Sequence, residues 1–80
     1  MTDQELLTDL TNIFRDIFDD EGIQLSADTT AADIQNWDSL NHINLIVAIE
    51  MRYKIKFKTA EIEGLQNVGE LVNAVAVKLS

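Results

Sequence analysis

Residues 38–50 read DSLNHINLIVAIE, and this stretch does most to decide the fold. Its apolar residues recur at helical spacing after an aspartate, a residue type that favours the N-cap position. We therefore expect a helix that begins near Asp38 and runs to about Tyr53. Such a start places the Ser39 hydroxyl in the first turn, where backbone N–H groups lack intrahelical acceptors and the helix dipole is positive. That position suits a hydroxyl that carries a phosphate ester.

Apolar residues at helical spacing also predict a first helix over roughly Asp3 to Asp19. Thr2 and Glu5 have the spacing of a capping box at its start. After it, residues 20–37 contain many turn and cap residues with a few apolar ones, which indicates a long, ordered loop. The apolar residues of the first helix are Leu6, Leu7, Leu10, Ile13, Phe14, Ile17 and Phe18.

Two helices are expected in the last third of the chain. A short one covers Thr59 to Glu63 and ends at Gly64, and a longer one is capped by Asn67 with Glu70. The fold class is therefore all-α, a small four-helix bundle with three main helices, one short helix and a long loop between the first two. The inward-facing residues of the last helix are Val68, Leu71, Val72, Val75 and Leu79.

The segment Met51–Lys58 alternates apolar and basic residues, a pattern that by itself is typical of a strand with one buried face. No other segment alternates as well, so a strand here has no partner. We therefore interpret the segment as a helix end followed by an extended linker, whose Ile55 and Phe57 pack into the core.

Composition limits the functions that remain plausible. The 80 residues form one domain (1–80) with a net charge of −8, which argues against nucleic-acid binding and for a soluble protein that meets basic partner surfaces. We expect a monomer. There is no cysteine and only one histidine, so the chain has no thiol of its own and a zinc site is not expected. The acidic N-terminus and the absence of a long apolar run predict a cytoplasmic protein without membrane insertion.

The Asp38-Ser39-Leu40 motif after a long loop, the helix that follows it and the acidic composition resemble the acyl carrier protein family over essentially the whole chain. The resemblance implies that Ser39 is the attachment site for phosphopantetheine, which a separate Mg²⁺-dependent transferase takes from coenzyme A. Asp38 and Leu40 complete the attachment motif, and Leu40 and Val47 match partner-facing positions.

The family's function, as the resemblance implies it, is to hold acyl intermediates as thioesters on the thiol of the arm. The carrier delivers them to acyl-activating or acyl-transferring enzymes in fatty acid, polyketide or related specialised biosynthesis. The chain contains no nucleophile with a matching base, so we expect no catalytic residue and no enzyme activity. Two alternatives stay open: a carrier for aminoacyl or peptidyl groups, and an acidic helical adaptor in which Ser39 is structural or phosphorylated.

Several residues depart from the family pattern. Asn41 and Asn44 stand where fatty acid carriers usually have acidic residues, which indicates a specialised carrier and partners that differ from the ordinary synthases. Both are candidate partner-recognition residues. Trp37 replaces a small or polar residue before the motif, and packing under the loop is favoured over contact with the arm or a partner.

His42 is a further candidate recognition residue, three positions after Ser39 and so on the same helical face. An exposed polar role is favoured, although a protonated imidazole could attract a phosphate on Ser39. The basic cluster Arg52, Lys54, Lys56 and Lys58 is interpreted mainly as a solvated surface, and contact with a membrane or an acidic partner stays open as the alternative.

A bundle of this kind can also open an apolar channel for a bound acyl chain. Four residues are candidates to line it, although the core needs apolar residues at these positions in any case: Ile43, Ile46, Ile62 and Leu65.

Overall fold

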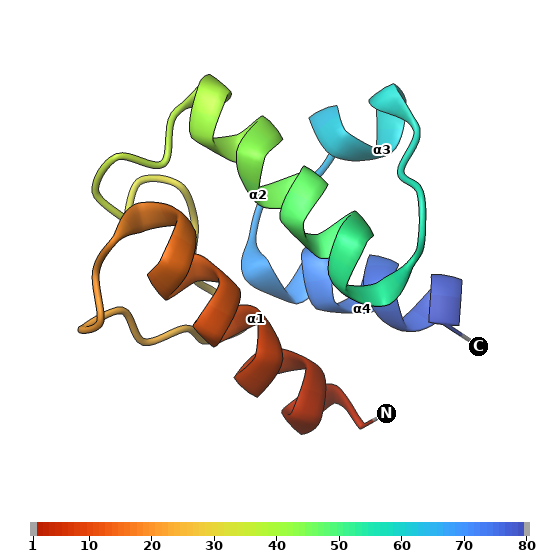
Figure 1. Cartoon of the computed structure of the whole chain (residues 1–80), viewed down its shortest axis with the longest axis horizontal. Coiled ribbons are helices and arrows are strands. Elements are labelled where there is room, and N and C mark those ends of the chain that lie inside the picture. Colours follow the sequence, from red (N-terminus) through yellow and green to blue (C-terminus); the bar gives the residue numbers. More distant parts are fainter. Residues whose placement is uncertain (1, 80) are drawn as a thin grey trace.

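The computed structural model describes residues 2–79, and within that range it contains four helices and no strand (Figure 1). This confirms the expected all-α bundle of three main helices and one short helix. The helix bounds agree with the sequence-based ones to within one residue. They are α1 (Asp3–Phe18), α2 (Ser39–Tyr53), α3 (Thr59–Glu63) and α4 (Val68–Leu79).

The first helix, α1, begins at the predicted capping box. Thr2 Oγ1 accepts a hydrogen bond from the backbone N–H of Glu5 at 3.1 Å, and Glu5 Oε1 accepts one from the backbone N–H of Thr2 at 3.0 Å. The helix ends at Asp19, whose φ of 50° is left-handed. Its buried residues recur at every fourth position and form one stripe along the helix. They are Leu6, Leu10, Phe14 and Phe18.

The core lies where α1 packs against α2 and α4. Most of the residues predicted to face inward from α4 are buried there, but Leu79 is 39% exposed, so that part of the prediction is wrong. Leu79 is the last residue of α4 in the described part of the chain and lies one turn beyond Val75, the last buried residue of the helix. The buried apolar residues are Leu6, Leu10, Phe14, Phe18, Ile23, Leu45, Ile46, Ile49, Val68, Leu71, Val72 and Val75.

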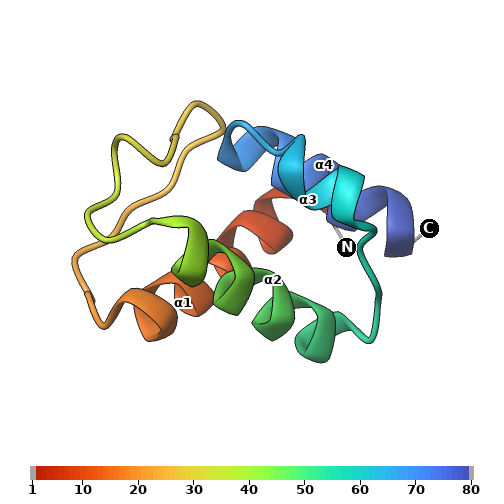
Figure 2. The ribbon, with the colours of Figure 1, turned by 90° about the horizontal axis from the view of Figure 1, so that it is seen from above.

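The loop between α1 and α2 is ordered by hydrogen bonds to the start of α4. Figure 2 shows the loop running close to this end of the helix. The carbonyl oxygens of Thr29 and Ala27 accept hydrogen bonds at 2.9 Å from the backbone N–H groups of Val68 and Gly69. These are first-turn donors that the helix itself cannot satisfy. The side-chain oxygen of Asn67 accepts a third N–H, three residues further on, at 2.8 Å, which confirms the predicted cap.

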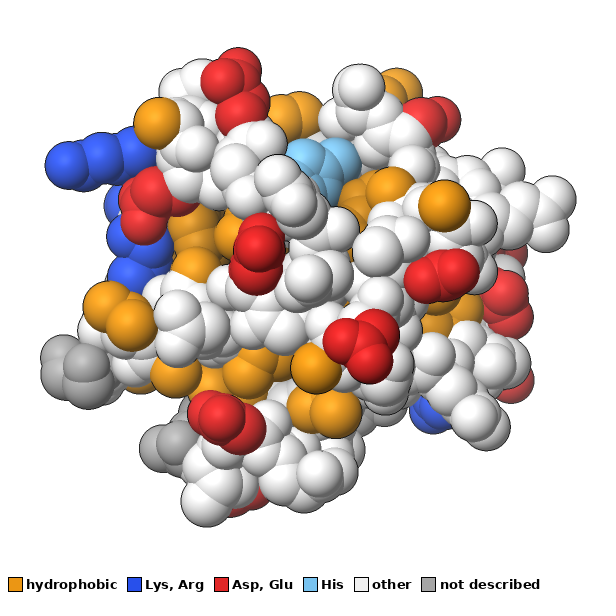
Figure 3. Space-filling model, turned by 180° about the vertical axis from the view of Figure 1, so that it is seen from behind, with side chains coloured by type: hydrophobic (Ala, Val, Ile, Leu, Met, Phe, Trp, Pro, Cys, Tyr) orange, Lys and Arg blue, Asp and Glu red, His pale blue; other side chains and the backbone are white. Residues whose placement is uncertain are grey.

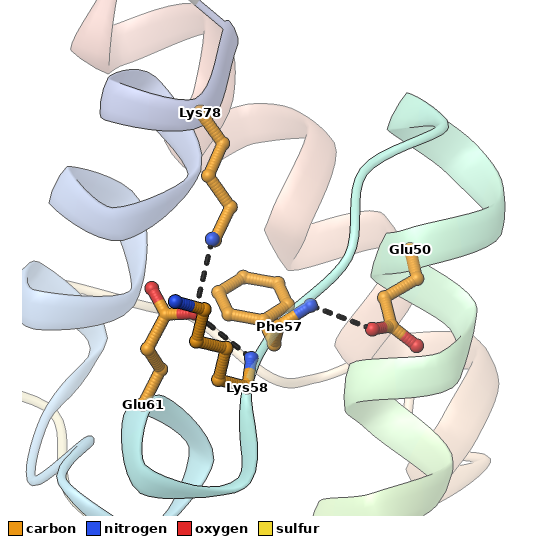
Figure 4. Close-up of polar contacts among 5 residues, drawn as sticks. All are labelled: Glu50, Phe57, Lys58, Glu61 and Lys78. Carbon is orange, nitrogen blue, oxygen red and sulfur yellow. Dashed lines mark hydrogen bonds and ion pairs between the residues drawn. The ribbon is translucent and has the colours of Figure 1, made fainter.

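The segment after α2 is an extended linker, as expected, and not a strand. The helix ends at Lys54, whose φ of 58° is left-handed. Ile55 and Phe57 then pack, half-buried, against the core. Glu50 Oε2 accepts a hydrogen bond from the backbone N–H of Phe57 at 2.8 Å, so the linker folds back along the end of α2 (Figure 4).

Glu61 attaches α3 to both the linker and α4. Its Oε1 accepts a hydrogen bond from the backbone N–H of Lys58 at 2.8 Å and one from the ammonium of Lys78 at 3.0 Å (Figure 4). The same ammonium lies 5.2 Å from the centre of the Phe57 ring, a cation–π distance. These contacts order a five-residue helix that has no buried residue of its own.

Candidate functional site

Ser39 is the first residue of α2, and it is exposed. Asp38 precedes it as the N-cap, and its Oδ1 accepts a hydrogen bond from the backbone N–H of Asn41 at 2.9 Å. The Asp38 carbonyl accepts the N–H of His42 at 2.8 Å, which is the first bond of the helix. Within residues 2–79 no hydrogen bond engages the Ser39 hydroxyl, so the helix start presents it free to solvent.

The Asn41 side chain is hydrogen-bonded to the segment that precedes Ser39. Its Nδ2 donates at 2.8 Å to the carbonyl of Asn36, a residue with a left-handed φ of 70°. The same carbonyl accepts the backbone N–H of Asp38 at 2.9 Å, and Asn44 Nδ2 lies 3.4 Å from Asn41 Oδ1. Asn41 is half-buried and Asn44 is exposed. The structural role of Asn41 was not predicted from the sequence. The signal for it is the asparagine at position 36, a residue type that tolerates left-handed backbone.

Trp37 packs under the loop, which confirms the favoured interpretation. Its ring stands edge-on to Phe14, with 5.1 Å between ring centroids and an interplanar angle of 86°, and it lies 6.2 Å from the ring of Phe18. Its indole N–H donates to His42 Nδ1 at 3.1 Å. A buried indole needs such an acceptor, so Trp37 links the core of α1 to the first turn of α2.

His42 is half-buried and not exposed, a correction to the expected surface role. Its Nδ1 accepts from Trp37, and its Nε2 lies 3.2 Å from the carbonyl oxygen of Ile62 in α3. Both ring nitrogens therefore face protein groups. The correction has a physical cause, since the indole of Trp37 and the carbonyl of α3 offer the ring two partners that a helical wheel does not reveal.

A cleft of about 460 Å³ lies beside Ser39, between the start of α2 and α3. Three of the four residues expected to line an acyl channel are on its walls, whereas Ile46 is 1% exposed in the core and is not. Figure 3 shows that hydrophobic side chains reach the surface at several places on the face opposite to that of Figure 1. The residues that line the cleft are Ala31, Trp37, Asp38, Ser39, His42, Ile43, Ile62, Glu63, Leu65 and Gln66.

One face of α2 carries an exposed row of apolar side chains. Leu40, Val47 and Met51 are 71%, 45% and 76% exposed. Val47 and Met51 follow Leu40 by seven and eleven residues, so all three lie on one side of the helix. Leu40 and Val47 were expected to be exposed, but Met51 was missed because it reads as part of the alternating segment. The first turn of α2 adds no acidic residue to the exposed N-cap Asp38, so Asp38 is the carboxylate next to Ser39 in the sequence.

The basic residues at the end of α2 and after it divide into two groups. Arg52 donates to Asp9 Oδ2 on α1 at 3.2 Å. Lys54, Lys56 and Lys58 have exposed side chains, in line with the solvated surface that was expected. The cluster therefore serves partly to join helices and partly to cover the surface.

Three ionisable groups of the described chain have shifted pKa values. The hydrogen bond from the backbone N–H of Thr2 holds the pKa of Glu5 below its usual range, and the other two groups, Tyr53 and Glu61, join secondary-structure elements. The pKa of Tyr53 is raised to about 12, first by partial burial and then by the hydrogen bond from its hydroxyl to the Asp9 carboxylate. Hydrogen bonds from the backbone N–H of Lys58 and from the Lys78 ammonium hold the pKa of Glu61 below its usual range. None of the three groups lines the cleft beside Ser39.

Among the described residues no group of three or more His, Asp or Glu side chains is placed to hold a metal ion. Within the same range no helix is both long enough and apolar enough to span a bilayer.

Comparison with known proteins identifies the family. A family model described as "Phosphopantetheine attachment site" matches residues 8–75. An acyl carrier protein of Rhodococcus erythropolis (strain PR4 / NBRC 100887) is 27% identical over 71 residues, which cover 89% of this chain and 78% of that protein. The solution structure of a holo acyl carrier protein from Geobacter metallireducens matches with a TM-score of 0.87 and 53% identity, over 91% of this chain and 84% of that one. The chain therefore belongs to the acyl carrier protein family, as a carrier with covalently attached phosphopantetheine and not an enzyme.

Proposed function

We propose that Ser39 carries the phosphopantetheine arm and that the protein delivers acyl groups on it to partner enzymes of fatty acid, polyketide or related specialised biosynthesis. The observation that carries this proposal is the exposed Ser39 hydroxyl at the start of α2, without a hydrogen bond inside the described chain. A phosphopantetheinyl transferase needs a hydroxyl that is accessible in this way.

The surroundings of Ser39 suit the group. First-turn backbone N–H groups and the positive end of the helix dipole favour a phosphodiester at this position. Asp38 and Leu40 flank it as the rest of the attachment motif, with Asp38 ordering the turn and Leu40 exposed. When bound, phosphopantetheine supplies a thiol that holds an acyl group as a thioester, and the chain itself supplies position and recognition.

We infer that partner enzymes bind the α2 face next to Ser39. Of the residues proposed for recognition, Asn44 and Val47 are exposed and accessible, whereas Asn41 and His42 are half-buried and hydrogen-bonded within the chain. Direct contact is therefore proposed for Leu40, Asn44 and Val47, and an indirect role for the other two. Within the first turn of α2 no acidic residue follows Asp38, so charge attraction at this face contributes less than the net charge of −8 alone suggests.

The cleft beside Ser39 is the proposed site for part of the cargo. Ile43, Ile62 and Leu65 give it apolar walls next to the attachment serine, and burying a methylene group there contributes about 0.8 kcal/mol. Such walls favour fatty or polyketide acyl groups over polar aminoacyl groups. A structure of the protein with a long acyl chain attached tests this assignment, because a chain lying wholly in solvent would reject it.

A single domain over residues 1–80, a monomeric state and a cytoplasmic location complete the proposal. The net charge of −8 supports the monomer, because like-charged molecules repel one another. Light scattering after size-exclusion chromatography and fractionation of cells test the last two statements.

Intact-protein mass spectrometry tests the attachment site. The protein is incubated with coenzyme A, Mg²⁺ and a broad-specificity phosphopantetheinyl transferase, beside Ser39→Ala and the control Ser26→Ala. We expect the parent and the control to gain one phosphopantetheine and Ser39→Ala to gain none. Modification of folded Ser39→Ala, or none of the folded parent while a known carrier is modified, would reject Ser39 as the site.

A further inference from the structure

His42 joins three segments through its imidazole ring. Nδ1 accepts the indole N–H of Trp37 at 3.1 Å, from the segment before α2, and Nε2 lies 3.2 Å from the carbonyl oxygen of Ile62 in α3. An indole N–H only donates and a carbonyl only accepts, so the neutral ring with hydrogen on Nε2 satisfies both contacts at once. We name these two contacts together the His42 bridge.

The position of α3 relative to α2 depends on few contacts. The helix has five residues, none of them buried, and the main helix packing of the molecule is that of α1 against α2 and α4. On its outer side, Glu61 accepts the Lys78 ammonium of α4 at 3.0 Å. On its inner side, Ile62 is half-buried along the cleft, as is Leu65 just after the helix, and the His42 bridge reaches across to the backbone of Ile62.

We propose that the His42 bridge sets the width of the cleft between α2 and α3 and so limits the length of acyl chain that the cleft encloses. The effect on the width of the cleft is inferred from the geometry alone, whereas the effect on acyl-chain length rests on the proposed function. Ser39 lies at the edge of this cleft, with Ile43 on one wall and Leu65 on the other. Removing the bridge releases α3 from its polar contact with α2, and the cleft opens more readily.

The first test measures backbone hydrogen exchange by NMR in the protein without its arm. His42→Phe retains a ring and removes both hydrogen bonds, His42→Gln retains a donor and an acceptor, and the exposed Gln35→Ala is the control. The reporters are the N–H groups of Ile62 and Gly64, which donate within α3. Loss of about one hydrogen bond corresponds to exchange about tenfold faster at these sites in His42→Phe.

In the same spectra we expect the buried α4 positions Val72 and Val75 to exchange as in the parent protein, so that the effect is local. His42→Gln lies between the parent and His42→Phe, and Gln35→Ala matches the parent. Unchanged exchange at Ile62 in folded His42→Phe would overturn the proposal. If that variant does not fold, Trp37→Phe removes the indole donor, retains an aromatic ring and is expected to accelerate exchange at Ile62 in the same direction.

The second test uses the loaded protein. A transferase loads arms that bear saturated acyl chains of increasing length, and the rate at which hydroxylamine cleaves each thioester reports how well the chain is enclosed. We expect the longest protected chain to be longer in His42→Phe than in the parent or Gln35→Ala. If the longest protected chain is the same in His42→Phe and in the parent, the proposed effect on acyl-chain length is overturned. If no form accepts the arm, the proposed function fails together with that effect, and the exchange experiment still decides the width.

Discussion

The hydroxyl of Tyr53, the last residue of α2, donates a 3.0 Å hydrogen bond to Asp9 Oδ2 on α1, and the Arg52 guanidinium donates to the same oxygen at 3.2 Å. Ser39 lies at the opposite end of α2. One carboxylate thus fixes the far end of the helix against α1, and this leaves the attachment end to be positioned by its N-cap and by the loop.

Replacement of Tyr53 by phenylalanine tests this attachment. The change keeps the ring and removes a partly buried hydrogen bond to a carboxylate, so we expect a loss of about 1 kcal/mol in the free energy of unfolding. Urea denaturation followed by circular dichroism at neutral pH measures it. A variant as stable as the parent would show that the contact contributes nothing.

The same residue predicts a loss of stability in alkali. The pKa of Tyr53 is about 12 in the folded protein, above its ordinary value of 10.0, so folding favours the protonated phenol. Its contribution is complete below pH 10 and is lost as the pH rises towards 12. The difference in unfolding free energy between the parent and Tyr53→Phe isolates the effect of this one hydroxyl. That difference should shrink from pH 9 to pH 11.5, and a constant difference would contradict the assignment.

The contacts of Glu61 lead us to expect a loss of stability in acid. Its pKa is held below the ordinary 4.5, so its contribution to stability is present above pH 4.5 and is lost as the pH falls through the lower folded value. Glu61→Gln should therefore weaken the dependence of unfolding on pH between 6 and 3. Glu63→Gln, on the same helix, is the matched control. Equal slopes in the two variants would argue against the contacts shown for Glu61.

Even a methyl side chain at position 69 is predicted to be too large for the space around it. A Cβ at this position would lie 3.0 Å from the carbonyl oxygen of Ala27 and 3.2 Å from its Cβ. Alanine normally favours a helix over glycine by about 1 kcal/mol, but here we expect overpacking to win and Gly69→Ala to lose about 1–2 kcal/mol. Gly22→Ala is the control, since its Cβ would meet only the flexible Asp20 carboxylate at 3.3 Å. Thermal denaturation compares them, and a stabilised Gly69→Ala would contradict the close approach.

Asp38 is predicted to act on stability through its oxygen and not through its charge. Asp38→Ala removes the N-cap acceptor of the Asn41 N–H and should cost about 1 kcal/mol, whereas Asp38→Asn retains an acceptor and should stay near the parent. Urea denaturation distinguishes the two. If both variants lose the same stability, the charge and not the cap is responsible.

Local patterns in the sequence predicted the helices well because their ends are capped by neighbours in the chain. Thr2 with Glu5, and Asn67 three residues before Glu70, make the expected contacts. The extended linker was also correctly inferred, because a lone alternating segment has no strand to pair with.

The parts that sequence did not predict depend on residues brought together by folding. His42 was expected at the surface, but Trp37 and the carbonyl of Ile62 converge on it from two other segments. The role of Asn41 depends on the left-handed conformation of Asn36, and Ile46 faces the core and not the cleft because α2 turns that side towards α1. None of these relations has a signature in residue spacing.

The most direct test of the central claim is to locate the phosphopantetheine by fragmentation mass spectrometry of the transferase-modified protein. The account predicts a single modification on Ser39, the exposed hydroxyl at the start of α2. The account also predicts that Ser39→Ala, shown to be folded by circular dichroism, carries no phosphopantetheine. An arm found on another residue, or a folded protein that accepts none from an active transferase, would contradict it.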